Sequence, residues 1–150
     1  MRDALEDAGY FCIDNLPADL LVSAAHSLHE RGAQRLAVAI DARSGIVPSA
    51  VATPTTEAVA HTDQASDLLA AIAQLRAWAG SVQVLFLSAN TGTLIARFSE
   101  TRRKHPLSTL NDQNLALTLD DCIALERGWM APLAAAAHVL DTSGLSVAAL

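Results

Sequence analysis

Four of the ten cationic residues in this sequence fall within eight positions, a spacing suited to holding a multiply charged anion. They are Arg97, Arg102, Arg103 and Lys104, and Glu100 is the one carboxylate among them. Guanidinium groups stay charged at neutral pH and can clamp phosphate oxygens in pairs. The stretch therefore resembles the arginine-rich lid that covers polyphosphate in small kinases.

Other interpretations stay open for the cations of this stretch and for His105, which follows them. The cations follow a predicted helix, and positive charge is favourable at a helix carboxyl terminus even without a ligand. His105 could titrate near neutral pH. Because Pro106 follows it, a hinge contact is favoured over acid–base catalysis.

A carboxylate ends a second candidate segment. The apolar run Leu36-Ala-Val-Ala-Ile40 is followed by Asp41, and Arg43 and Ser44 come next. An aspartate in this position can hold Mg²⁺, directly or through water, in phosphate-binding proteins. The alternative is a solvated strand end, and Arg43 and Ser44 could contact phosphate or a base.

The remaining chemistry-bearing residues give weaker signals. His26 and His29 share a helix face but lack a third metal ligand in view, and Asp120 with Asp121 is predicted to be solvated. The serines lack a G-x-S-x-G nucleophile motif. Lys104 is the only lysine, so no G-x-x-x-x-G-K-[ST] phosphate loop lies in these 150 residues.

Composition predicts one globular domain. The 150 residues are 51% hydrophobic and 17% charged, which suits a single core of small aliphatic side chains. A net charge of −6 and 4% aromatic residues argue against broad nucleic-acid binding. Two cysteines are expected to be buried and reduced, and no apolar run reaches a membrane span of about 20 residues. The charged amino terminus is not a signal peptide, so we expect a cytoplasmic protein.

Apolar periodicity predicts an α/β fold with a parallel sheet covered by helices on both faces. Ligands of such sheets bind beyond the carboxyl ends of the strands. We therefore expect that edge to gather Asp41 and the guanidinium groups, with Asp14 and Ser88 at other strand ends. The predicted strands are 10–13, 35–41, 82–88 and 138–141; the predicted helices are 2–8, 17–31, 63–78, 91–101, 115–136 and one beginning at 146; residues 44–61 are predicted to be a loop.

Three motifs carry a resemblance that spans nearly all of the chain. They are Gly9-Tyr-Phe-Cys-Ile-Asp-Asn-Leu-Pro17, Ile40-Asp-Ala-Arg-Ser44 and Arg97-Phe-Ser-Glu-Thr-Arg-Arg-Lys-His-Pro-Leu107. Together they resemble the RapZ/YvcJ family of bacterial P-loop nucleotide-binding proteins. The resemblance implies a P-loop kinase-like three-layer sandwich, truncated here at its N-terminal strand. The family's glycine-rich loop would precede residue 1, and its C-terminal domain would follow residue 150.

The resemblance also implies site residues and ligands. Asp41, Ala42, Arg43 and Ser44 match the block linked to guanine nucleotide, and Asp41 is the candidate Mg²⁺ ligand. The lid-like block, whose phosphate role is our interpretation, supplies Arg97, Arg102, Arg103 and His105. The expected ligand is ATP or GTP with Mg²⁺, not tightly bound, with weak hydrolysis that is reduced or lost without the phosphate loop.

The resemblance further implies an adaptor role, in which the full-length protein presents a small RNA to an endoribonuclease. The oligomeric state stays open, and no membrane partner is expected. The alternative function is a non-catalytic module that binds RNA or protein through residues 97–105. A small-molecule kinase is a third hypothesis, with Asp14 facing the phosphoryl acceptor, and it ranks last because no lysine-bearing loop is present.

Overall fold

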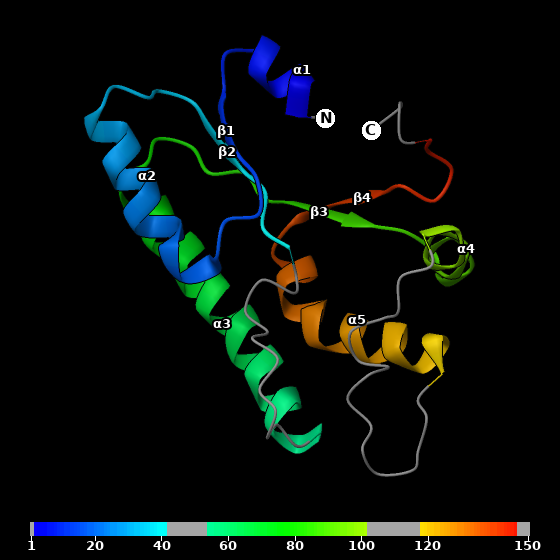
Figure 1. The fold of residues 1–150 in the computed structure, drawn as a ribbon. Coiled ribbons are helices and arrows are strands. Elements are labelled where there is room, and N and C mark those ends of the chain that lie inside the picture. Colours follow the sequence, from blue (N-terminus) through cyan, green and yellow to red (C-terminus); the bar gives the residue numbers. More distant parts are fainter. Residues whose placement is uncertain (1, 42–53, 102–117, 147–150) are drawn as a thin grey trace. The chain divides into compact units, whose positions relative to one another are not determined.

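Short parallel strands alternate with helices along the part of the chain that the structure describes. This computed structural model describes residues 2–41, 54–101 and 118–146 (Figure 1). The elements are α1 (Arg2–Asp7), β1 (Phe11–Ile13), η1 (Ala18–Leu20), α2 (Leu21–Glu30), β2 (Leu36–Val38), α3 (Pro54–Trp78), β3 (Leu85–Ser88), α4 (Thr91–Thr101), α5 (Leu119–Ala135) and β4 (His138–Asp141). The α/β class is therefore confirmed.

The strands pair in parallel, as predicted, but as two separate pairs within the described residues. In one pair Phe11 of β1 is in register with Leu36 of β2, and in the other Leu85 of β3 is in register with His138 of β4. The expectation of one sheet is therefore not met in these residues. A continuous apolar run specifies burial but not which strand becomes the neighbour, so pairing could not be predicted from it.

The chain divides into two units, each of which contains one strand pair. The first unit comprises residues 1–49 and 63–82, and the second comprises residues 50–62 and 83–150. The first therefore contains α1, β1, η1, α2, β2 and most of α3, and the second contains β3, α4, α5 and β4.

The first unit has an apolar core between α2 and α3. Figure 1 shows these helices side by side, to the left of the β1–β2 pair and extending below it. Leu21 and Ala25 of α2 are buried with Ala71 and Leu75 of α3. Partly buried side chains surround them: Leu16, Val22, Leu36, Val38, Ile40, Leu68 and Val82. The helical spacing of these residues places one face of each helix in the core.

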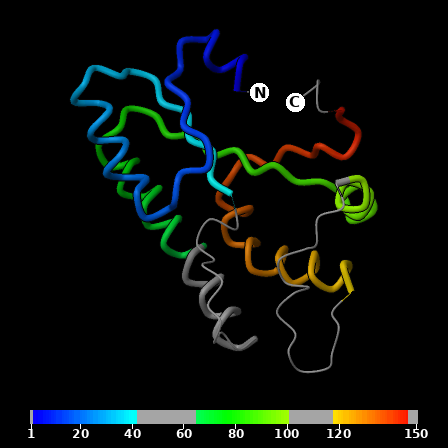
Figure 2. Tube along the Cα trace, viewed as in Figure 1, coloured from blue at the N-terminus to red at the C-terminus, as the bar shows by residue number. Residues whose placement is uncertain are grey.

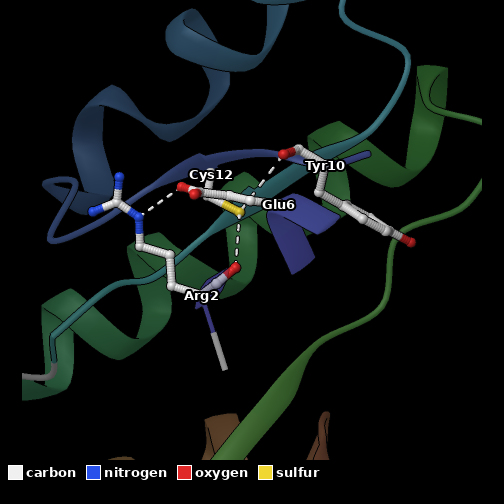
Figure 3. Close-up of polar contacts among 4 residues, drawn as sticks. All are labelled: Arg2, Glu6, Tyr10 and Cys12. Atoms are coloured by element: carbon white, nitrogen blue, oxygen red, sulfur yellow. Dashed lines mark hydrogen bonds and ion pairs between the residues drawn. The ribbon is translucent and has the colours of Figure 1, made fainter. Parts of the chain in front are cut away.

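The motif that begins at Gly9 is built on a tight connection between α1 and β1 (Figure 3). Gly9 ends α1 with φ of +82°, and its amide donates to the Glu6 carbonyl at 2.9 Å. That left-handed conformation favours glycine, which confirms the predicted helix end. The Cys12 thiol points to the carbonyls of Arg2 and Tyr10, at 4.0 and 3.8 Å, and Arg2 Nε donates to Glu6 Oε1 at 2.7 Å.

In the second unit the chain leaves α5 and returns as β4 beside β3 (Figure 2). A capping box starts α5: the Thr118 hydroxyl accepts from the Asp121 amide, and the Asp121 carboxylate accepts from the Thr118 amide at 3.0 Å. The Thr118 hydroxyl also donates to Asp121 Oδ2 at 2.6 Å. This bond, followed by the bond from the Thr118 amide, lowers the pKa of Asp121. The helix therefore begins at residue 119 instead of the predicted 115, and it continues through Pro132.

Three sequence predictions need correction. Residues 54–61, predicted as loop, are helical, because Pro54 occupies the first helical position, where its missing N–H costs no hydrogen bond. The strands are less covered than predicted: Leu85 is 55% exposed and Phe11 52%. Both cysteines are free as expected, but only Cys122 is fully buried.

None of the helices in the described ranges has the length and apolarity needed to cross a membrane.

Candidate functional site

The carboxyl ends of β3 and β4 meet at one edge of the second unit, as the parallel register requires. Ser88 of β3 is paired with Asp141 of β4. Just beyond them, the Thr142 amide and hydroxyl both donate to the Ser88 carbonyl, at 2.7 and 2.9 Å. Thr142 is only 4% exposed. The predicted strand end at Ser88 is therefore confirmed, and it belongs to a network of polar contacts that we call the strand-end network.

A carboxylate organises the outer part of this network. Asp141 Oδ1 accepts from the Ser143 amide at 2.9 Å and from the Ser143 hydroxyl at 2.5 Å. That hydroxyl in turn accepts from the Asn90 amide at 2.7 Å. The two hydrogen bonds from Ser143 lower the pKa of Asp141, with a smaller contribution from the charge of Arg127. Asp141 is therefore held as a carboxylate over the neutral range.

Helix α4 begins at the same edge. Asn90 precedes it and caps it: the Thr93 amide donates to Asn90 Oδ1 at 2.8 Å, and the Leu94 amide donates to the Asn90 carbonyl at 3.0 Å. Amide groups and the helix dipole make the amino end of an α-helix favourable for negative charge. The edge thus combines a helix amino terminus with hydroxyl and amide side chains.

Arg97 of α4 points its guanidinium at the segment that follows β4. Nη1 donates to Thr142 Oγ1 at 3.2 Å, and Nη2 donates to the carbonyls of Thr142 at 2.7 Å and Leu145 at 3.3 Å. Arg97 is the member of the predicted phosphate-binding set that the structure describes. Arg102, Arg103 and His105 lie outside the described residues.

Arg127 is a second arginine at this edge, and it was not among the predicted site residues. Its guanidinium, carried by α5, donates to the carbonyl of Ala89, which is 4% exposed. A lone arginine in a helix has no local signal of such a role, because the contact depends on how α5 packs. Asn90 and Ser143 were also missed, although their positions one or two residues beyond strand ends could have indicated them.

The corresponding strand ends of the first unit are joined by the backbone. The Leu16 amide donates to the Ala39 carbonyl at 3.1 Å, and the Ala39 amide donates to the Ile13 carbonyl at 2.8 Å. Asp14 follows β1 directly, whereas Asp41 lies three residues past the end of β2 and is exposed. Ala42, Arg43 and Ser44 of the predicted nucleotide-binding block lie outside the described residues.

Metal and histidine predictions fall in the first unit as well. Among the described residues no group of three or more His, Cys, Asp or Glu side chains could hold a metal ion, so the Mg²⁺ role of Asp41 stays a prediction. The His26 ring stacks on Trp78 with centroids 4.2 Å apart, and the His29 centroid lies 5.4 Å from that of Trp78. These histidines therefore pack α2 on α3.

Asp41 and Arg97 belong to different units, so the expectation that they share one pocket also stays a prediction. What the structure does bring together is the strand-end network of the second unit. It combines two arginines, hydroxyls, a helix amino terminus and the Asp141 carboxylate, which accepts from the Ser143 hydroxyl. Such a site is suited to binding a polar or anionic ligand.

Parallel strands joined through helices, with polar groups at their carboxyl ends, define an α/β protein of the type that binds ligands at that edge. The chain matches the RapZ-like N-terminal domain over residues 2–150 and belongs to that family. The resemblance seen in its three motifs is thereby confirmed.

Relatives of the chain are named as nucleotide-binding proteins. One from Polynucleobacter necessarius subsp. necessarius is 44% identical over 147 residues, which are 98% of this chain and 44% of that protein. Others are 44% identical in Burkholderia thailandensis and 46% in Burkholderia vietnamiensis, each match covering 95% of this chain and 43% of the relative. The chain therefore spans less than half the length of these relatives.

Proposed function

We propose that this chain is a nucleotide-binding regulatory domain that binds ATP or GTP at the carboxyl ends of its strands. The observation that carries the proposal is family membership, with relatives named for nucleotide binding. The strand-end network supports it, because parallel α/β proteins bind ligands at this edge. In the first unit, Asp41 and the adjoining residues 42–44 are the residues proposed to bind nucleotide, because they match the family's guanine-nucleotide block.

Mg²⁺ is proposed to accompany the nucleotide, with Asp41 as its ligand. For the 150 residues taken alone the proposed affinity is low, since no lysine-bearing phosphate loop lies among them. Each missing charge-assisted hydrogen bond would weaken nucleotide binding by about 1–3 kcal/mol. For the same reason, hydrolysis of ATP or GTP is proposed to be weak or lost.

Isothermal titration calorimetry of the 150-residue chain with ATP and with GTP, each with and without Mg²⁺, tests the proposal. We expect weak saturable binding of at least one nucleotide, strengthened by Mg²⁺ and reduced in the Asp41→Asn variant. The Asp67→Asn variant is a matched control, because Asp67 is an exposed aspartate of α3 and the substitution removes the same charge. Absence of saturable binding at nucleotide concentrations up to about 10 mM would overturn the proposal. That limit corresponds to a favourable binding free energy of less than about 3 kcal/mol.

An adaptor role in small-RNA-linked ribonuclease control is proposed on the resemblance alone, as is a cytoplasmic location. The alternative, an RNA- or protein-binding module that uses residues 97–105, ranks second. In the described part of that stretch, Arg97 donates to Thr142 and Leu145 instead of adding to an open cationic surface. RNA binding that weakens steeply with salt and is lost in an Arg102→Ala/Arg103→Ala variant would reverse this ranking.

A further inference from the structure

The contacts of Arg97 are unusual for a residue expected to hold phosphate. Both of its terminal nitrogens donate to groups of the 142–145 segment, namely the Thr142 hydroxyl and the backbone carbonyls of Thr142 and Leu145. A planar guanidinium can reach such diverging acceptors at once because its N–H groups are fixed in a fork. A lysine ammonium is a point charge and cannot reproduce this geometry.

Thr142 connects Arg97 to the end of β3. Its hydroxyl donates to the Ser88 carbonyl at 2.9 Å and accepts from Arg97 Nη1 at 3.2 Å. The single hydroxyl proton is therefore used toward Ser88, and an oxygen lone pair is used toward Arg97. Because Thr142 is 4% exposed, water has little access to replace either bond. A continuous chain of contacts thus runs from β3 through Thr142 to α4.

A second contact lies one helical turn earlier on α4. Thr93 and Arg97 are four residues apart and so share one face of the helix. The Thr93 hydroxyl donates to the Ser143 carbonyl at 3.5 Å, and the neighbouring Asn90 amide donates to the Ser143 hydroxyl at 2.7 Å. The 142–145 segment is therefore attached to α4 at successive turns, and Arg97 makes the most bonds in the attachment.

We propose that Arg97 is a positioning residue, which fixes residues 142–145 against α4 through Thr142 and does not itself bind phosphate. It thereby sets the shape of the strand-end network. The consequence for ligands rests on the proposed function: nucleotide affinity depends on Arg97 through the geometry of its guanidinium, not through its charge. Positioning itself does not depend on that function.

Amide hydrogen exchange of the 150-residue chain, without nucleotide, tests the positioning. In Arg97→Lys and Arg97→Gln we expect the amides of Asn90, Thr142 and Leu145 to exchange about tenfold faster or more, since the bonds that hold their segment are lost. The Ala39 amide of the first unit should be unaffected and reports that the fold is intact. Arg76→Gln controls for the change in charge. Unchanged exchange at all three amides in both Arg97 variants would overturn the proposal.

Titration with ATP or GTP then separates positioning from direct phosphate contact. Positioning predicts that Arg97→Lys weakens binding about as much as Arg97→Gln, although it keeps the charge. It also predicts that Thr142→Val weakens binding by about tenfold whereas Thr142→Ser, which keeps the hydroxyl, restores it. Full affinity in Arg97→Lys together with full affinity in Thr142→Val would mean that Arg97 acts by charge on the ligand, which contradicts the proposal. If the unmodified chain binds neither nucleotide, the proposed function fails and hydrogen exchange still decides the role of Arg97.

Discussion

The two units of this chain differ in the hydrogen bonds at the carboxyl ends of their strands. Each contains a pair of short parallel strands whose carboxyl ends must be connected to helices. In the first unit these ends are joined by backbone hydrogen bonds, as between Leu16 and Ala39, and the α2–α3 core is apolar. In the second unit the Thr142 amide makes a backbone bond of the same kind to the Ser88 carbonyl, and side chains add to it: the buried Thr142 hydroxyl bonds to both Ser88 and Arg97.

This difference indicates where specificity resides. An apolar core depends on volume and tolerates similar side chains, whereas a buried polar network requires each donor and acceptor to be matched. We therefore expect the α2–α3 core of the first unit to respond mainly to changes in volume, and the strand-end network of the second unit to respond mainly to changes in hydrogen bonding. Substitutions in each unit can test that contrast.

The largest effect is expected from truncating the apolar core. Leu75→Ala should lower the free energy of unfolding by about 3 kcal/mol, because it removes a side chain that is 8% exposed and leaves a cavity. Urea denaturation measures the change. The control is Leu20→Ala, whose side chain is 47% exposed and should cost about 0.5 kcal/mol or less. Equal effects of the two substitutions would contradict the assignment of the core.

A smaller effect is expected where a polar contact is removed in the second unit. Arg127→Gln should lower the free energy of unfolding by about 1 kcal/mol, because the carbonyl of buried Ala89 loses its donor. Urea denaturation of this variant should be compared with that of Arg76→Gln, which removes the same charge from an exposed site of the first unit. If Arg76→Gln is at least as destabilising, net charge and not the contact explains the effect.

The pH dependence of the free energy of unfolding should reveal the contribution of the Asp141 carboxylate. Hydrogen bonds from Ser143 place the folded pKa of Asp141 below its ordinary value of 3.8. Its contribution to stability is therefore fully present above that value and is lost as the pH falls through the lower folded pKa. Acid unfolding of Asp141→Asn should show less loss of stability below about pH 4 than the unmodified chain. An identical acid profile in both proteins would show that the carboxylate makes no linked contribution.

The last comparison, which perturbs the protein least, is between the alkylation rates of the two thiols. Burial raises the pKa of Cys122, and its side chain is fully enclosed, so thiolate formation and access are both disfavoured. Cys12 is only partly buried. Iodoacetamide should therefore label Cys12 first, by at least about tenfold in rate, as measured by peptide mass spectrometry. Labelling of Cys122 at the same rate under native conditions would show that the second unit opens readily.

Local signals predicted the elements better than their partners. The bounds of α4 and β4 agree with the predicted 91–101 and 138–141. The start of α3 was wrong because Pro54 was interpreted as a loop residue instead of the first residue of a helix. Strands 35–41 and 82–88 were predicted too long, because an apolar run continues past the residues that pair.

The candidate site could be predicted where a residue ends a strand or belongs to a charged motif. Ser88 was found in this way, whereas Arg127 was not, since its contact with Ala89 arises from the packing of α5. Arg97 was found by its charge and its motif, yet the pattern could not show that its donors face Thr142 and Leu145. Charge in a sequence identifies a donor, but the fold determines the acceptor.

The central claim is that the strand-end network of the second unit contacts nucleotide, and a heteronuclear NMR titration of the labelled chain with ATP and GTP tests it most directly. We expect the amide resonances of Asn90, Ser143 and Gly144 to shift progressively and saturably, while amides of the α2–α3 core such as Ala25 and Ala71 stay in place. Saturable shifts that leave Asn90, Ser143 and Gly144 unmoved would contradict the account, as would the absence of any saturable shift with either nucleotide.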